Sequence, residues 1–365
     1  MVAGRPGARS VQGAESLPDR ATIPDNRRHA APGSAVTADA DRALLDRLAA
    51  GPVSGDALAR EAGLTRAAVW KRIEALRAAG VRIDARAGRG YALAAPVDLL
   101  DAGRIAAALP APVREGLAAL EVAWSLDSTN SRLLRLGDPG PGTRVLLAER
   151  QTGGRGRRGR PWASPLAANL YLSVARRFDA GLARLGGLSL VAGIAVVDAL
   201  HALGVERARL KWPNDLVVVA EGRLRKLGGI LVEGGGEYAG PAHAVIGIGL
   251  NVRMPPEAGE AIDQPWIDLL ALGAFPPRDH VAAAVLAHLL PALDRFDAEG
   301  LAPFLRAYAA QDALAGQPVR ILAGEGEHHG TALGVAADGA LRVRTAGGER
   351  LFHAGEVSLR AEADA

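Results

Sequence analysis

A stretch near the middle of the chain carries the residue types best suited to binding anions. Residues 153–160 read Gly-Gly-Arg-Gly-Arg-Arg-Gly-Arg, so four arginines and four glycines occupy eight positions. Guanidinium groups hold phosphates and carboxylates through paired hydrogen bonds, and glycines let backbone N–H groups approach an anion closely. The stretch is not a P-loop, because no Gly-Lys-Ser/Thr follows. It is interpreted either as an anion-binding loop or as an exposed Arg-Gly segment that binds nucleic acid nonspecifically.

Two strand-like segments must position this arginine loop, defined here as residues 153–160. The apolar run Val145 to Ala148 precedes the loop, and Asn169 to Val174 follows it with the alternation of a strand. Because glycine is unfavourable in the interior of helices and strands, the loop is expected to be irregular and mobile. The pattern predicts a flexible cationic loop held between two strands of a folded domain.

Further polar side chains stand where other predicted elements begin or end. Asp127-Ser-Thr-Asn130 begins a predicted helix, where capping alone explains the residue types and a bound polar ligand is the second interpretation. Asn214-Asp215 reads as a turn. Lys226 precedes an apolar strand whose glycines, Gly228-Gly229, indicate that another group approaches closely. Asn251 is an amide in an otherwise apolar strand, so it needs a partner in the protein or in a ligand.

The composition excludes several classes of protein. The chain has 365 residues, 49% of them hydrophobic and 23% charged, which suits two or three domains with buried cores. It contains no cysteine, which excludes disulfides and thiolate metal sites, and its eight histidines show no His-x-x-x-His spacing. No apolar run approaches a membrane span and no secretory signal is recognisable, so we expect a cytoplasmic protein without membrane contact.

Positive charge is concentrated towards the N-terminus. Residues 1–37 are rich in Ala, Gly, Pro, Arg and Ser without a sustained period, which predicts a disordered tail. Residues 41–93 carry ten Lys and Arg against six Asp and Glu, whereas the whole chain has a net charge of only +3. A nucleic-acid contact is therefore expected in this part of the chain.

Residues 38–95 have the pattern of a winged helix-turn-helix. An apolar helical stripe starts at Ala38, and Ser54 and Thr65 are placed to cap two further helices joined by a glycine turn. Segments 81–84 and 90–93 read as the strands of a wing. The third helix would enter a DNA groove, and a three-helix packing module with a solvated basic face is the alternative. The predicted DNA-binding residues are Arg66, Trp70, Lys71 and Arg89.

Residues 96–313 predict a larger mixed α/β domain, and residues 314–365 a small β domain. In the larger domain a short amphipathic helix contains Ile105 and Leu109, and further helices are expected at 185–203, 280–298 and 301–309. Its strands are expected at 120–124, 224–232 and 244–252. In the small domain, short strands at 319–322, 331–335, 341–345 and 349–352 predict a barrel or sandwich.

Several motifs follow one another in a specific order. They are the winged helix-turn-helix, Asp127-Ser-Thr-Asn130, Gln151 with the arginine loop, Lys211-Trp-Pro-Asn-Asp215, Lys226-Leu-Gly-Gly-Ile-Leu-Val-Glu233 and Gly247-Ile-Gly-Leu-Asn-Val252. In this order they resemble the bifunctional biotin-protein ligases that also act as biotin-operon repressors. The resemblance covers the chain from about residue 38 onward. It implies an α+β protein whose central domain is of the class II synthetase and biotin ligase type, with a C-terminal SH3-like β-barrel.

The resemblance implies a reaction in two steps. The biotin carboxylate attacks the α-phosphate of ATP to give biotinyl-5′-adenylate and pyrophosphate, and the acyl group then passes to one lysine of a biotin carboxyl carrier protein. The arginine loop would offset the repulsion between carboxylate and triphosphate, and its ordering would protect the adenylate from water. Mg²⁺ is expected to enter with ATP, held mainly by phosphate oxygens, so no protein ligand is assigned.

The resemblance also implies roles for individual residues. The biotin-binding set is Ser128, Thr129, Asn130, Gln151, Arg155, Gly156, Arg157, Lys226 and Gly229. The ATP- and adenylate-binding set is Arg157, Arg158, Arg160, Trp162 and Asn251. Catalysis is assigned to Lys226, Arg157 and Asp215, with Asp215 orienting or deprotonating the incoming lysine amine, because only the neutral amine is nucleophilic.

The family's regulation would make the adenylate a corepressor that favours a homodimer on an operator with two half-sites. Trp70 departs from this expectation, because it is unexpectedly bulky for a recognition helix. Two alternative functions stay open at this point. One is a DNA-binding biotin sensor without transferase activity, and the other is a lipoate-type ligase on a related catalytic fold.

Overall fold

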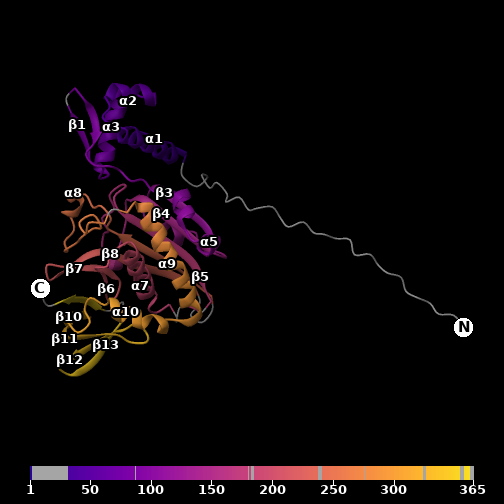
Figure 1. The fold of residues 1–365 in the computed structure, drawn as a ribbon, viewed down its shortest axis with the longest axis vertical. Coiled ribbons are helices and arrows are strands. Elements are labelled where there is room, and N and C mark those ends of the chain that lie inside the picture. Colours follow the sequence, from indigo (N-terminus) through magenta and orange to yellow (C-terminus); the bar gives the residue numbers. More distant parts are fainter. Residues whose placement is uncertain are drawn as a thin grey trace.

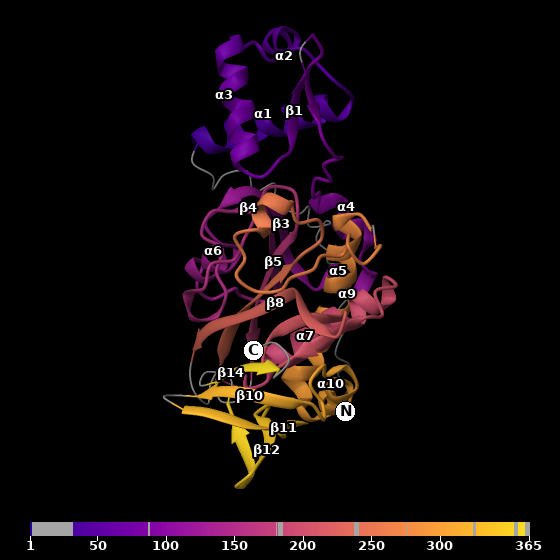
Figure 2. The same ribbon diagram turned by 90° about the vertical axis from the view of Figure 1, so that its left-hand side faces the viewer.

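Three parts follow one another along the long axis of the protein (Figures 1 and 2). The structure is a computed structural model and describes Met1 and residues 32–86, 88–179, 181, 185–236, 241–274, 276–323, 326–353 and 357–361. A helical N-terminal part lies at one end, a seven-stranded sheet with its helices in the middle, and a smaller sheet at the other end. Most of the tail predicted for residues 1–37 lies outside the described residues.

The N-terminal part has the predicted winged helix-turn-helix. Its elements are α1 (Pro32–Ala49), α2 (Gly55–Ala62), α3 (Arg66–Ala78), β1 (Ile83–Arg86) and β2 (Gly90–Leu93). The predicted caps are confirmed: the side chains of Ser54 and Thr65 accept hydrogen bonds from backbone N–H groups in the first turns of α2 and α3. Helix α1 begins earlier than predicted, at Pro32, a residue type that suits the first turn of a helix.

The central part is built on one mixed sheet. Its elements are α4 (Ala102–Ala108), α5 (Ala111–Glu115), β3 (Leu117–Leu126), α6 (Thr129–Arg135), β4 (Thr143–Gln151), η1 (Arg157–Gly159), β5 (Leu170–Phe178), α7 (Leu188–Ala202), β6 (Ala208–Lys211), β7 (Asp215–Ala220), β8 (Arg223–Gly236), β9 (Ala242–Leu250), α8 (Pro256–Gly259), α9 (Arg278–Glu299), η3 (Ala302–Phe304) and α10 (Leu305–Gln311). The strand order is β3-β4-β5-β9-β8-β7-β6. The β3–β4 pair is parallel, and the other neighbouring pairs are antiparallel.

The two faces of this sheet carry different helices. Alternate residues of β5, such as Leu172 and Val174, are buried in the main core with α7 and α9. On the opposite face, Ala175 of β5 packs with Leu133 of α6 in a smaller cluster. Because α6 is only a short helix, it covers little of its face. The loops and strand ends around α6 are therefore free to form a site.

The predicted small C-terminal β domain is confirmed. Its strands are β10 (Pro318–Ala323), β11 (Gly326–Val335), β12 (Leu341–Thr345), β13 (Gly348–Phe352) and β14 (Val357–Ala361). Within the described residues they form an antiparallel sheet in the order β13-β12-β11-β10-β14. The sequence pattern missed β14, which is short and finds its register only by pairing with β10. The indole of Trp212 donates a hydrogen bond to the backbone oxygen of Gly339 at 3.0 Å and ties this sheet to the central part.

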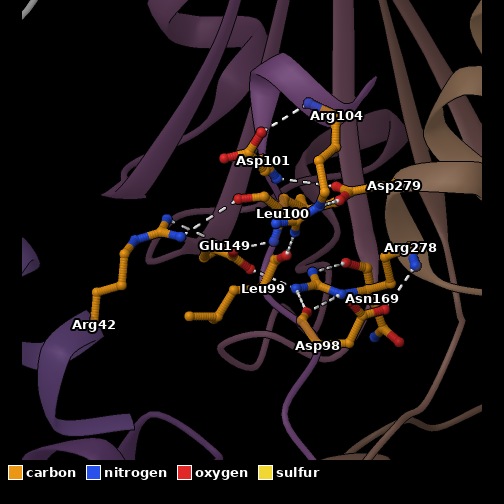
Figure 3. Close-up of polar contacts among 10 residues, drawn as sticks. All are labelled: Arg42, Asp98, Leu99, Leu100, Asp101, Arg104, Glu149, Asn169, Arg278 and Asp279. Atoms are coloured by element: carbon orange, nitrogen blue, oxygen red, sulfur yellow. Dashed lines mark hydrogen bonds and ion pairs between the residues drawn. The ribbon is translucent and has the colours of Figure 1, made fainter. Parts of the chain in front are cut away.

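A buried polar network lies where the N-terminal and central parts meet (Figure 3). Glu149 of β4 and Arg278 of α9 form an ion pair at 2.7 Å, with side chains only 0% and 2% exposed. The other Glu149 oxygen accepts the backbone N–H of Leu100 at 2.6 Å, while Arg42 of α1 approaches that oxygen at 4.0 Å. The network therefore joins α1, the connecting segment and the sheet.

Among the described helices, none is both long and apolar enough to cross a membrane.

Candidate active site

The structure brings nearly all the predicted ligand-binding residues to one pocket on the α6 face of the sheet. The predicted residues that line it are Ser128, Thr129, Asn130, Gln151, Arg155, Gly156, Arg157, Arg158, Arg160, Trp162, Asp215, Lys226 and Gly229. They come from the start of α6, the end of β4, the arginine loop and the segment after it, the start of β7, and β8. Residues from 128 to 229 in the sequence therefore share one cavity.

A hydrogen-bonded group of neutral polar side chains forms one end of the pocket. Ser128 caps α6, and the Gln151 side-chain oxygen accepts hydrogen bonds from the backbone N–H and hydroxyl of Thr129, at 2.8 and 3.1 Å. The buried Ser173 hydroxyl on β5 lies 2.7 Å from the Thr129 hydroxyl and 2.6 Å from the Asn130 side-chain oxygen. The capping role of this motif is therefore real, and it orients the same side chains towards the pocket.

The arginine loop is more compact than its composition predicts. The Gly156 N–H donates to the Arg160 carbonyl at 2.8 Å, and the Trp162 N–H donates to the Gly154 carbonyl at 2.9 Å. These bonds close a narrow hairpin with the short 3₁₀ turn η1 at its tip. Arg158 adopts a left-handed backbone conformation there, with φ of 57°. The hairpin projects arginine side chains over the pocket, while the predicted mobility of the loop stays a prediction.

At the other end of the pocket, cationic side chains lie near Asp215, which is the one carboxylate among the described lining residues. The Lys226 ammonium lies 2.7 Å from Asp215 and 5.5 Å from the centre of the Trp162 ring. Arg157 donates to the Asn214 side chain at 3.2 Å. Desolvation, followed by repulsion from Arg158, lowers the pKa of Arg157 below its usual value. A bound anion would stabilise the charged form of Arg157 and offset both effects, so this end of the pocket favours negatively charged ligands.

Two glycines of β9 let the pocket side chains lie directly on the sheet. A Cβ atom at Gly249 would stand 2.6 Å from the Trp162 ring, and one at Gly247 would stand 2.3 Å from the Asn130 side-chain oxygen. Both distances are shorter than real contacts permit. The sequence contained these glycines within a motif, but only the structure explains their presence.

Asn251 lies apart from the other predicted residues. It is buried, and its side-chain amide donates to the backbone oxygens of Lys226, at 3.3 Å, and Ile267, at 3.1 Å. It does not belong to the described lining of the pocket. In this structure Asn251 supports the backbone beside Lys226, so its contact with adenine stays a prediction.

Glu233, Ser131 and Ser173 were not predicted from the sequence to act in the site. The Arg155 guanidinium pairs with Glu233, with one nitrogen 3.0 Å from each carboxylate oxygen, and its other terminal nitrogen donates to the Ser131 hydroxyl. Its contact with biotin stays a prediction. Glu233 is a carboxylate directly after an apolar run and Ser173 is a hydroxyl within one, and both patterns draw attention to these residues.

The described residues offer little to hold a metal ion directly. They contain no group of three His, Cys, Asp or Glu side chains placed to bind one. The described pocket lining contributes one carboxylate, Asp215, which is paired with Lys226. This donor set fits an ion that keeps most of its oxygen ligands from phosphates and water, as Mg²⁺ does.

The predicted DNA-binding residues are all exposed on the winged helix. Arg66, Trp70 and Lys71 are exposed on α3, and Arg89 is exposed in the wing. Trp70 is 54% exposed, which is unusual for so large an apolar side chain. Arg66 lies 3.3 Å from Asp56, an exposed ion pair that phosphate can replace at little cost. Contact of these residues with DNA stays a prediction.

Comparison with known proteins agrees with this architecture. The chain matches an HTH domain over residues 42–92, the Biotin/lipoate A/B protein ligase family over residues 123–251, and the Biotin protein ligase C terminal domain over residues 315–360. It is 41% identical to the bifunctional ligase/repressor BirA of Salmonella typhimurium, over 87% of this chain and 96% of that protein. The identity to Escherichia coli BirA is 40%, over 84% and 92% of the two chains.

The chain is also similar to a protein named only as a ligase and to a solved ligase structure. The biotin–[acetyl-CoA-carboxylase] ligase of Paracoccus denitrificans is 36% identical, over 63% of this chain and 96% of that protein. The structure of biotin protein ligase from Aquifex aeolicus in complex with biotin and ATP superposes with a TM-score of 0.55 at 29% identity, covering 67% of this chain and all of that one. Since the HTH, catalytic and C-terminal segments are all matched and the identity to both BirA proteins is at least 40%, this chain belongs to the bifunctional biotin protein ligase/repressor family.

Proposed function

We propose that the pocket activates biotin with ATP and transfers it to a lysine of a biotin carboxyl carrier protein. The observation that carries this proposal is the division of the pocket into two ends. Neutral hydrogen-bonding groups surround Thr129, whereas Arg157, Arg158, Arg160 and Lys226 surround the other end. A neutral ureido ring suits the first end, and a carboxylate next to a triphosphate suits the second.

In the first step, a biotin carboxylate oxygen attacks the α-phosphorus of ATP, and the bond to the bridging oxygen of pyrophosphate breaks. We assign the attacking carboxylate to the Lys226 ammonium, and the phosphate oxygens to Arg157 as charge moves onto the leaving group; both residues line the pocket. The lowered pKa of Arg157 reports a desolvated guanidinium, which interacts more strongly with an anion than an exposed one does. Mg²⁺ bound to ATP would supply further charge neutralisation.

In the second step, a neutral lysine amine attacks the acyl carbon and AMP leaves. Asp215 is the residue proposed to orient this amine or accept its proton. The Asp215 carboxylate forms an ion pair with the Lys226 ammonium at 2.7 Å. When Lys226 turns to a ligand carboxylate, Asp215 loses this partner and becomes available to the incoming amine. The ion pair thus supports a switch of partners between the two steps.

The ligase proposal is tested by incubating the purified chain with ATP, magnesium, biotin and a carrier-protein fragment. Intact mass spectrometry should detect one biotin on the carrier, only when all components are present. Lys226→Ala and Arg157→Gly should each reduce transfer, with Arg114→Ala on α5, outside the pocket, as a matched cation control. Transfer of lipoate instead of biotin would favour the lipoate-type ligase. Binding of biotin and ATP without transfer would favour the sensor.

The second proposed function is biotin-responsive binding to operator DNA. It is supported by the exposed Arg66, Lys71 and Arg89 on the winged helix and by the family membership. We propose that the adenylate favours a homodimer, which would match an operator with two half-sites. Sedimentation with and without biotin and ATP tests the dimer. An unchanged monomer in the presence of adenylate would refute this mechanism.

Since the reaction consumes ATP, we place the protein in the cytoplasm.

A further inference from the structure

Glu233 sits where β8 passes beside both the start of α6 and the base of the arginine loop. One Arg155 nitrogen lies 3.0 Å from each of its carboxylate oxygens, and the Asn130 amide donates to one of these oxygens at 2.9 Å. The side chains of Arg155 and Glu233 are 30% and 28% exposed, so water screens the ion pair only in part. Glu233 itself is absent from the described lining of the pocket.

The contact with Arg155 anchors the base of the arginine loop. Arg155 faces Pro161 in an isolated antiparallel bridge, and the Trp162 N–H bonds to the Gly154 carbonyl directly beside it. The tip of this narrow hairpin carries Arg157, so a shift of the base moves the tip as well. Glu233 therefore influences cations that it does not touch.

The contact with Asn130 orients the neutral end of the same pocket. The Asn130 amide nitrogen donates both to Glu233 and to the Leu231 carbonyl, which directs its side-chain oxygen towards the Ser173 hydroxyl. That hydroxyl also lies beside Thr129, the partner of Gln151. One carboxylate thus reaches the α6 side of the pocket through hydrogen bonds and the loop side through an ion pair.

We propose that Glu233 is a positioning residue that ties the arginine loop to the start of α6, and thereby sets the affinity for biotin and the retention of the acyl-adenylate. A carboxylate is required because both of its neighbours are donors. A glutamine has only one acceptor oxygen, so in either orientation its amide group would face the donor nitrogen of Arg155, and in one orientation that of Asn130 as well. This inference rests on the proposed activation of biotin.

The test measures biotin-dependent pyrophosphate release by the full-length protein and its Glu233→Gln, Glu233→Asp and Glu233→Ala variants. Glu121→Gln is the matched control, because Glu121 is an exposed strand carboxylate outside the pocket. We expect Glu233→Gln to raise the KM for biotin about tenfold with little change in kcat, Glu233→Ala to raise it further, and the control to behave as wild type. Release of pre-formed adenylate should accelerate in the same order.

A double-mutant cycle with Arg155→Met separates positioning from a merely structural role. If Glu233 acts through Arg155, the effect of Glu233→Gln on the KM for biotin should largely disappear when Arg155 is already replaced. An unchanged KM in all three variants, a fall in kcat alone, or additive effects in the cycle would overturn the proposal. If a variant melts early, Glu233→Asp, assayed well below its melting temperature, decides the outcome. A wild-type protein without biotin-dependent pyrophosphate release would instead refute the ligase proposal.

Discussion

Replacing Gly249 by alanine tests whether the contact between Trp162 and the sheet is needed for catalysis. The added Cβ would stand 2.6 Å from one indole carbon, whereas ordinary contact begins at 3.4 Å, so the ring must move by about 0.8 Å. Gly249 is not among the residues with positive φ, so alanine fits its backbone without strain. The perturbation is therefore confined to the wall of the pocket.

The expected loss of activity follows from the contact between Lys226 and the Trp162 indole. Lys226 lies 5.5 Å from the Trp162 ring centre, a cation–π contact that contributes about 0.5–2 kcal/mol. Crowding in a well-packed site adds about 1–3 kcal/mol. Part of this cost is relieved by movement of the ring into the open pocket. Since about 1.4 kcal/mol corresponds to a tenfold change in rate, we expect kcat/KM for biotin activation to fall roughly 10- to 100-fold.

The assay is biotin-dependent pyrophosphate release, with Gly235→Ala as the matched control. Gly235 also lies in the sheet, on β8, but its added Cβ would meet the His243 ring at an ordinary distance of 3.5 Å. The control should therefore keep wild-type activity, and both variants should keep the wild-type fold by circular dichroism. If Gly249→Ala were as active as the control, Trp162 would not need its position on the strand, and the reasoning would fail.

Three further predictions concern stability. Gly90→Ala should unfold the winged helix, because Gly90 has φ of 81° and its Cβ would stand 2.1 Å from the Val53 carbonyl. The variant should therefore lose binding to duplex DNA at low salt while biotin transfer persists. Intact DNA binding in a gel-shift assay would contradict this. Glu149→Gln should lower the free energy of unfolding in urea by about 3–5 kcal/mol by leaving the Arg278 charge unpaired, whereas adding Arg278→Met should recover part of the loss; an additive double variant would contradict this. Burial raises the pKa of Asp312 to about 6, so the folded state binds the proton more tightly than the unfolded state does. The stabilisation that protonated Asp312 gives to the folded state is therefore complete below about pH 4 and is lost as the pH rises through 6. Asp312→Asn should therefore gain stability over wild type above pH 6, by about 1–3 kcal/mol, and melting curves with a constant difference from pH 4 to 7.5 would refute this.

Local features of the sequence predicted much of the fold. Ser54 and Thr65 cap helices as expected, because an N-cap needs only a side-chain oxygen and the N–H groups of the following turn. The apolar alternation around the arginine loop likewise predicted its flanking strands, β4 and β5. Where local cues competed, boundaries moved: β1 begins at Ile83 rather than Val81, because the Val81 N–H still bonds to the Leu76 carbonyl at the end of α3.

The sequence alone determined most of the residue types in the pocket, since its motifs contain nearly all the predicted residues that line it. Only the tertiary structure decided how they are partnered. Glu233 meets Arg155 because β8 and the arginine loop are brought together by the strand order, and Lys226 meets Asp215 through the pairing of β7 with β8. Asn251 turns towards backbone carbonyls for the same kind of reason. Such contacts depend on which strands become neighbours in the sheet, and a local apolar pattern shows which face of a strand is buried without naming that strand's partner.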